Sequence, residues 1–188
     1  MCLAIVLPAG KDVPREHLVK AWTSNPDGGG FAVAHKGKVI IRKGFMKMQE
    51  FLTEFEKARK KHKEKNFLLH FRIRSQGDRL PENTHPYEYE HGVVIHNGTI
   101  SGTGAVYGTG KSDTELFIER FGKDLDFETV RMHNKELSEA LDYNKLAFLF
   151  PDGKFLILNE GKGVWDEGIW YSHGGYKPYI TRVNGVVQ

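Results

Sequence analysis

The chain has 188 residues, of which 39% are hydrophobic and 27% charged, and its formal net charge is +3. This composition is typical of a globular protein that buries a core in one domain, and it excludes a membrane span, because no apolar run approaches about 18 residues. The charge is too small to indicate nucleic acid binding. The single cysteine excludes an internal disulfide, and together with the absence of a signal-peptide layout it predicts a cytoplasmic protein.

Short apolar or β-branched runs bounded by turn residues predict strands, and apolar spacings of three and four predict helices. In chain order these are strand 3–7, helix 13–23, strands 30–35 and 38–42, helix 47–63, strands 67–73 and 92–96, helices 113–121 and 127–141, and strands 146–150 and 154–158. His35-Lys36-Gly37 and Pro151-Asp152-Gly153 predict hairpin turns. Because the strands occur in groups with helices between the groups, the pattern favours antiparallel sheets layered with helices.

Cys2 is the only cysteine and directly follows Met1. Removal of Met1 would leave a thiol and a free α-amine on the same residue. An α-amine has a reference pKa of about 7.7–8.0, so it can take a proton from a neighbouring nucleophile and later return it. The alternative is a small buried hydrophobic residue at the start of an apolar strand. Position alone does not decide between the two.

Polar residues concentrate between positions 70 and 115. They form four runs: His70 to Gly77, Asn83 to Tyr87, His96-Asn97-Gly98, and Ser112 to Glu115. Each run has a structural explanation: Arg72 as an outward-facing strand residue, Asn97-Gly98 as a hairpin turn, and Ser112 to Glu115 as a capping box. Their order behind Cys2, at the ends of apolar strands, indicates instead that they form one site.

These runs resemble the class II glutamine amidotransferases, whose glutaminase domain belongs to the N-terminal nucleophile hydrolases. Members typically carry Met-Cys-Gly, His-Thr-Arg-Trp-Ala-Thr-x-Gly, Asn-x-His-Pro, His-Asn-Gly and Thr/Ser-Asp-Thr-Glu, and this chain keeps four of the five in the same order. Residues 25–31 also look like the Gly-rich turn and strand near the start of that domain. The resemblance implies an α+β fold, a four-layer αββα sandwich of two mostly antiparallel sheets. Residues 1–188 would form a single glutamine amidotransferase type 2 domain.

The resemblance also implies the chemistry. Cys2 would attack the side-chain amide of glutamine to give a γ-glutamyl thioester, with its own amine as base and then as acid to the leaving ammonia. The side-chain amide of Asn97 and the backbone N–H of Gly98 would form the oxyanion hole.

Substrate recognition is implied in the same way. Arg72 would hold the α-carboxylate of glutamine through its planar guanidinium, and Asp113 would pair with the α-ammonium. His85 would support the wall of the site rather than act as base, and Ser75 would belong to the substrate pocket. No cofactor and no metal is expected.

Two departures from the family pattern affect these expectations. Leu3 replaces the usual Gly after the nucleophile, and Ile73-Arg74 replaces the usual Trp-Ala of the loop that closes over glutamine. Closure would be weaker, and glutamine specificity is less secure than hydrolysis. An amidohydrolase of another amide and a catalytically idle binding module are therefore the alternatives.

The structure or role of three further segments has more than one interpretation. The basic run 57–65 is explained as a solvated helix end, or as a surface for an acidic partner. The aromatic stretch 165–171 is explained as a core strand, or as an interface. Since the chain ends at Gln188 without an acceptor domain, a separate synthetase is expected to receive the ammonia. Residues 105–112 fit a relaxed phosphate-binding loop, but a loop rather than a strand is expected before them.

Overall fold

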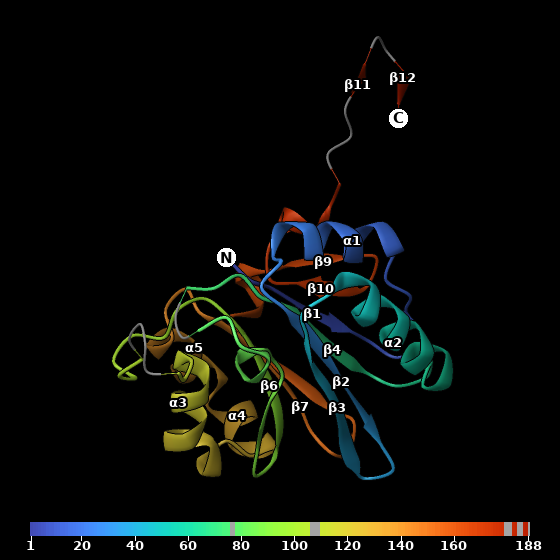
Figure 1. The fold of residues 1–188 in the computed structure, drawn as a ribbon. Helices are drawn as coiled ribbons and strands as arrows, with labels where there is room; N and C mark the ends of the chain where they lie inside the picture. The colour runs from blue at the N-terminus through green and yellow to red at the C-terminus, as the bar shows by residue number, and fades with distance from the viewer. Residues whose placement is uncertain (76–77, 106–109, 179–181, 184–185, 188) are drawn as a thin grey trace.

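The computed structural model describes residues 1–75, 78–105, 110–178, 182–183 and 186–187. Its two main sheets are antiparallel throughout and pack face to face (Figure 1). The six-stranded sheet has the order β3 (Lys38–Phe45), β2 (Gly29–His35), β4 (Phe67–Phe71), β1 (Leu3–Leu7), β10 (Ile169–Tyr171) and β9 (Val164–Asp166). The four-stranded sheet has the order β5 (Tyr87–Tyr89), β6 (Gly92–Asn97), β7 (Lys145–Leu149) and β8 (Phe155–Leu158). A separate pair is formed by β11 (Arg182–Val183) and β12 (Val186–Val187).

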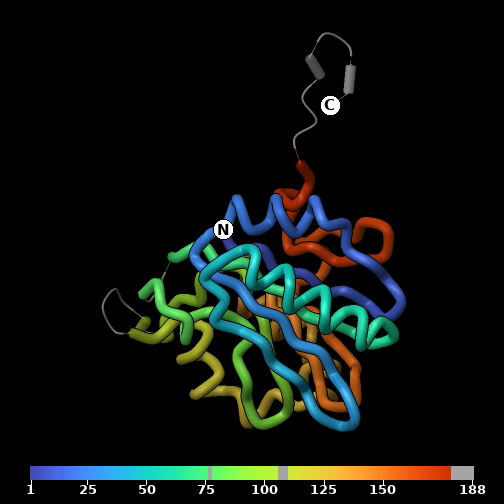
Figure 2. Tube along the Cα trace, turned by 45° about the vertical axis from the view of Figure 1, so that its right-hand side comes forward, coloured from blue at the N-terminus to red at the C-terminus, as the bar shows by residue number. Residues whose placement is uncertain are grey.

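Helices cover the outer faces of both sheets (Figures 1 and 2). The larger sheet is covered by α1 (Arg15–Ser24) and α2 (Met48–Lys61). The smaller sheet is covered by α3 (Asp113–Phe121), α4 (Phe127–Met132) and α5 (Asn134–Ala140). Single 3₁₀ turns occur at Pro81–Asn83, Gly122–Asp124, Glu160–Lys162 and Gly174–Tyr176. The layers therefore follow the predicted αββα order.

The five residues of β1 are all buried because this strand is covered on both faces. Leu3, Ile5 and Leu7 pack in the cluster under α1 and α2. The alternate residues Ala4 and Val6 face the smaller sheet, since successive side chains of a strand point to opposite faces. Small side chains on this inter-sheet face, such as Ala4, let the two sheets approach closely.

All seven predicted strands and both predicted hairpin turns are confirmed. Among these strands two boundaries differ by more than one residue: β3 continues to Phe45, and β4 ends at Phe71 rather than at 73. The single helix predicted over 127–141 is wrong, because the backbone leaves helical geometry at His133 (φ −102°, ψ 22°) and separates α4 from α5. The hairpin turn at Asn97-Gly98 is also wrong, because β6 pairs with β5 before it and with β7, which begins at Lys145.

The structure bears on two of the segments that have two interpretations, the aromatic stretch 165–171 and the basic run 57–65. The aromatic stretch forms the β9–β10 hairpin, in which Trp170 and Tyr171 are buried core residues while Trp165 stays 45% exposed. At the end of α2, buried Arg59 donates to the backbone carbonyl oxygens of His62 and Lys63 and so caps the helix. Arg59 is therefore a buried member of the basic run, whereas Lys57, Lys60 and Lys61 are exposed, as expected for a solvated helix end.

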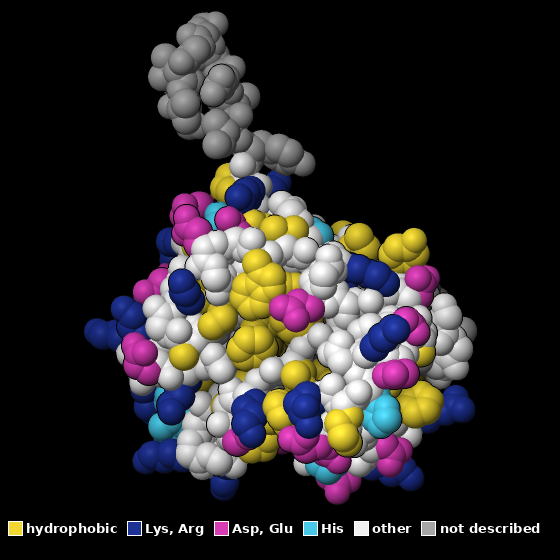
Figure 3. Space-filling model, turned by 180° about the vertical axis from the view of Figure 1, so that it is seen from behind, with side chains coloured by type: hydrophobic (Ala, Val, Ile, Leu, Met, Phe, Trp, Pro, Cys, Tyr) yellow, Lys and Arg dark blue, Asp and Glu magenta, His cyan; other side chains and the backbone are white. Residues whose placement is uncertain are grey.

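On the face seen in Figure 3, basic and acidic side chains are interspersed around a central gathering of hydrophobic ones. None of the helices in the described ranges is both long enough and apolar enough to cross a membrane.

Candidate functional site

Cys2 lies at the start of a strand that is hydrogen-bonded on both sides. β1 pairs with β4 and with β10, and the Leu3–Phe71 register, extended by one residue, puts Arg72 opposite Cys2. The thiol donates to the carbonyl oxygen of Ile73 at 3.2 Å, and the Ile73 N–H lies 3.4 Å from the same sulfur. The backbone of Ile73 therefore holds the sulfur whatever side chain stands at position 73.

The thiol is stabilised in its protonated form. Burial raises the pKa of the Cys2 thiol, and the nearby charge of Asp113 acts in the same direction. The hydrogen bond from the Ile73 backbone and the positive charges of Arg72 and the N-terminus offset part of this increase. Among the described residues, no titratable side chain hydrogen-bonds to the sulfur. A base is therefore needed to form the thiolate.

Two side chains converge on the carbonyl oxygen of Cys2. Asn97 donates to it through Nδ2, and the Nε2 atom of His173 lies 3.0 Å away. His173 Nδ1 accepts from the N–H of Gly175 at 3.0 Å. The proton of the neutral imidazole must therefore be on Nε2, so His173 also donates to the carbonyl oxygen of Cys2. His173 was not predicted as a site residue.

Asn97 and Gly98 lie where β6 ends, next to the nucleophile. Gly98 has φ +143°, a region that favours glycine, and a Cβ on it would stand 2.2 Å from Oδ1 of Asn144. Asn144 in turn accepts a hydrogen bond from His96 Nε2 at 2.9 Å. The His96-Asn97-Gly98 run is therefore held from behind by Asn144, which sequence reasoning also missed.

Arg72 and Asp113 are both buried and both act electrostatically on the thiol. The Arg72 guanidinium donates to the carbonyl oxygen of Asp78 at 3.0 Å. The two carboxylate oxygens of Asp113 accept from the backbone N–H groups of Ile100 (2.7 Å) and Thr114 (2.9 Å). Arg72 thus lowers the pKa of the Cys2 thiol, and Asp113 raises it. Because Arg72 is buried, its interpretation as an outward-facing strand residue is wrong.

His85 lies behind the site in a buried cluster with His70, His96 and Thr114. The His85 and His70 rings are 4.0 Å apart, and Thr114 Oγ1 lies 3.1 Å from His85 Nε2 and 2.8 Å from His96 Nδ1. His70 donates from Nε2 to the carbonyl oxygen of His96 at 2.8 Å. The Nδ1 atoms of His70 and His85 are buried, and neither has a hydrogen-bond partner in the part of the chain that the structure describes. All three rings are therefore neutral.

This cluster predicts acid sensitivity. Burial lowers the pKa of His70 to about 3, and it also lowers the pKa values of His85 and His96. Unfolded histidine titrates near pH 6.5. Below that pH the unfolded chain binds more protons, so the stabilisation is present above pH 6.5 and is lost as the pH falls. For His70 the loss should approach about 1.4 kcal/mol per pH unit between pH 6 and pH 5, and His85 and His96 add losses of the same sign.

Urea unfolding between pH 7.5 and pH 5 would measure this effect, because carboxylates scarcely titrate in that window. Partly buried His17 and His173 also have lowered pKa values and add smaller contributions of the same sign. His85→Gln should reduce the slope, because it removes one of the rings whose pKa is lowered in the folded state. An unfolding free energy that stays constant over this range would contradict the neutral-cluster assignment.

Other motif residues have structural partners. Ser112 caps α3 by accepting from the Glu115 N–H at 3.1 Å, as predicted. Asn83 donates to the carbonyl oxygens of Asp78 and Gly110 and so ties two loops together. Ser75 is exposed, and its hydroxyl has no hydrogen-bond partner in the described part of the chain. The phosphate-binding-loop pattern falls partly on residues 106–109, outside the described residues. As expected, a turn and not a strand stands at 101–102.

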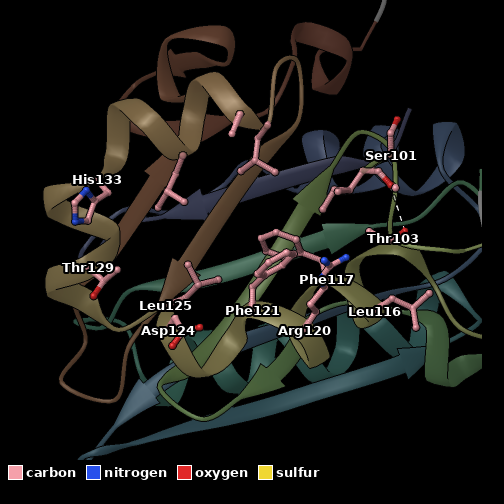
Figure 4. A pocket seen from close by; sticks show the side chains of 15 residues that line it. Ser101, Thr103, Leu116, Phe117, Arg120, Phe121, Asp124, Leu125, Thr129 and His133 are labelled. Atoms are coloured by element: carbon pink, nitrogen blue, oxygen red, sulfur yellow. Dashed lines mark hydrogen bonds between the residues drawn. The ribbon is translucent and has the colours of Figure 1, made fainter.

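Two neighbouring cavities lie on this side of the molecule, and the first of them reaches the site at Gly98. One, of about 400 Å³, is bounded by Met1, Gly98, Ile100, Leu141 and Tyr143 among others. The second, of about 530 Å³, lies between α3, α4, α5 and residues 100–103 and shares Ile100 and Leu141 with the first. Figure 4 shows Phe117 and Phe121 of α3 side by side in it. Within the described ranges, no group of three or more His, Cys, Asp or Glu side chains is arranged to hold a metal ion.

The layer order and strand topology define an N-terminal nucleophile hydrolase fold, and solved structures confirm it. The glutamine phosphoribosylpyrophosphate amidotransferase of Bacillus subtilis, complexed with ADP and GMP, matches with a TM-score of 0.53 and 16% identity over 91% of this chain and 41% of its own. A structure described as the allosteric regulatory enzyme of purine biosynthesis matches with a TM-score of 0.53 and 17% identity over the same shares. At these identities the likeness concerns the fold.

A curated protein is similar to this chain in sequence. The uncharacterized protein MJ1515 of Methanocaldococcus jannaschii is 28% identical over 149 residues, which is 71% of this chain and 42% of that protein. No family model matches. The chain thus spans about two fifths of the length of the relatives it matches.

Proposed function

We propose that this chain is a glutaminase of the class II glutamine amidotransferase type, that it hydrolyses the side-chain amide of glutamine to glutamate and ammonia, and that residues 1–188 form one such domain. The observation that carries the proposal is the convergence of Asn97, Arg72 and Asp113 on Cys2. These residues come from separate strands and a helix and are the ones that the resemblance singles out. The likeness in fold supports the same proposal.

The α-amine of Cys2 would be the base. The thiol needs one, and the described residues supply no titratable side chain in contact with its sulfur. Once Met1 is removed, the amine takes the thiol proton while the sulfur–carbon bond to the substrate amide forms. The proton then passes to the leaving nitrogen, the carbon–nitrogen bond breaks, and water hydrolyses the thioester to glutamate.

Asn97 would stabilise the tetrahedral intermediate. Its Nδ2 group carries two protons, of which one is donated to the carbonyl oxygen of Cys2. The second proton is available to the oxyanion, together with the N–H of Gly98. Glycine at 98 supports this role because both its φ and the contact with Asn144 exclude a side chain.

Arg72 and Asp113 would bind the two charged ends of the substrate α-amino acid. The carboxylate oxygens of Asp113 each accept one backbone N–H, which leaves lone pairs for an ammonium. Arg72→Ala and Asp113→Ala should each lower kcat/KM at least tenfold, because a charge-assisted pair contributes about 1.5–3 kcal/mol. Glutamate release measures this effect.

The rate of Cys2 alkylation by iodoacetamide should stay within a few-fold in both variants, and Arg131→Ala serves as the matched control, since Arg131 pairs with Glu128 on exposed α4. Unchanged glutamine kinetics in both variants would move the substrate pocket elsewhere.

The departures from the family pattern are compatible with activity. Leu3 is fully buried in the cluster under α1 and α2, and position 73 contacts the sulfur through its backbone. These contacts weaken the case for an idle binding module.

One observation favours a second candidate, an amidohydrolase of an amide with an apolar substituent: the cavity beside Gly98 includes Ile100, Leu141 and Tyr143. A γ-glutamyl anilide hydrolysed with a higher kcat/KM than glutamine would favour this candidate.

A separate synthetase that accepts the ammonia, and a cytoplasmic location, also belong to this proposal. The exposed lysines that follow Arg59 at the end of α2 are the surface that an acidic partner would contact.

A further inference from the structure

Lys145 is a buried cation that has no anionic partner among the described residues. It is 7% exposed, and its Nζ atom lies 3.5 Å from Asn97 Oδ1 and 3.4 Å from the carbonyl oxygen of Tyr143. Within the described ranges, no carboxylate lies within 4.0 Å of it. A buried ammonium with two long hydrogen bonds costs free energy, so its presence next to the site requires an explanation.

The pairing of β6 with β7 sets the position of Lys145. Asn97 and Lys145 stand directly opposite each other in the antiparallel register, so their side chains share one face. On the same face, Ile95 and Ala147 pack between the two sheets. Lys145 therefore points along the inter-sheet face toward the Asn97 amide and toward the end of the sheet where Cys2 lies.

The two neighbours of the Asn97 side chain leave it a single orientation. An ammonium can only donate a hydrogen bond, and a backbone carbonyl can only accept one. Because Asn97 lies between Lys145 Nζ and the carbonyl oxygen of Cys2, its Oδ1 must face Lys145 and its Nδ2 must face Cys2. The reversed amide would bring two donors together on one side and two acceptors together on the other.

We propose that Lys145 is a positioning residue that fixes the Asn97 amide with its N–H groups toward the reacting carbon. This inference rests on the proposed role of Asn97 as an oxyanion donor. The hydrogen bonds of Lys145 in the described part of the chain go to Asn97 and to the carbonyl oxygen of Tyr143, and none goes to the Cys2 sulfur. It acts through Asn97, so its loss should affect the rate of turnover more than substrate capture.

Lys145→Met tests the proposal, since it keeps the length of the side chain and removes the donor. We expect kcat to fall about tenfold or more, as for loss of a hydrogen bond to a charged group, with KM within about twofold. Lys145→Arg, which retains a cationic donor, should recover most of kcat. Lys154→Met on the β7–β8 turn is the matched control, because Lys154 is exposed and pairs with Asp152. An unchanged kcat in folded Lys145→Met would overturn the proposal.

A second readout is independent of turnover. The side-chain amide protons of Asn97, assigned by NMR through their loss in Asn97→Asp, should exchange with solvent at least about tenfold faster in Lys145→Met than in the unchanged chain. If the unchanged chain does not hydrolyse glutamine but this acceleration is seen, the proposed function fails and the positioning role stands. Equal exchange rates in both proteins would overturn the positioning role whatever the turnover.

Discussion

Replacing Asn97 by alanine is expected to lower kcat for glutamine by about 10²- to 10³-fold, the effect of removing one oxyanion-hole donor. Asn97 is fully buried at the end of β6 and donates to the carbonyl oxygen of Cys2. In the transition state its second N–H would meet the charge that develops on the substrate oxygen. KM should change much less than kcat, because the ground-state carbonyl carries little of that charge.

The experiment is a steady-state glutaminase assay on Asn97→Ala and on Asn97→Asp. The aspartate keeps the shape of the side chain but puts a carboxylate where the oxyanion forms, so its kcat should be at least as low as that of the alanine variant. Asn134→Ala is the control, since Asn134 likewise donates to one backbone carbonyl, that of Ile157, but on the outer side of the smaller sheet. A kcat for Asn97→Ala within threefold of the unchanged chain would exclude Asn97 from the oxyanion hole.

Retention of Met1 is expected to abolish turnover. With Met1 in place, the nitrogen of Cys2 belongs to a peptide bond, and its lone pair is delocalised and cannot accept the thiol proton. No other described titratable group contacts the sulfur. Met1 is 77% exposed, so its presence need not disturb the buried strand that follows. The two forms should therefore share one fold and differ in activity.

This prediction needs two preparations of the same sequence. One is released from a fusion by a protease that cleaves directly before Cys2, and the other carries an extension ahead of Met1 that is not removed. Intact mass identifies each N-terminus, circular dichroism compares the folds, and glutamate release measures activity. Full turnover by a population whose mass still includes Met1 would sink the single-residue mechanism.

Short-range signals predicted most of the fold. The apolar run of β1, the turn at Lys36-Gly37 and the Ser112 cap each depend on residues a few positions apart, and all three are confirmed. The strand β5 was not predicted, and the stretch 165–171 was interpreted as a core strand or an interface rather than as the β9–β10 hairpin. Each of these strands has three residues, too few for an alternating pattern to stand out. Their pairing is decided by neighbours far away in the chain.

The same distinction applies to the site. Cys2, Arg72, Asn97 and Asp113 were found through motifs, and the structure brings them together. Residues that support the motifs carry no local signal. Lys145 meets Asn97 across 48 positions and His173 meets Cys2 across 171, so both contacts depend on strand register, which sequence patterns leave open.

The central place of β1 in its sheet has a consequence for how the protein matures during synthesis. The ribosome makes Cys2 171 positions before His173, which binds its carbonyl oxygen. At about 5–20 residues per second, the ribosome needs roughly 10 to 30 s to cover that distance. Throughout this time β1 lacks its partner β10, and the N-terminus stays open to an aminopeptidase. If Met1 is removed during this time, as the proposed mechanism requires, processing precedes the pairing of β1 with β10, which must wait until nearly the whole described chain has been made.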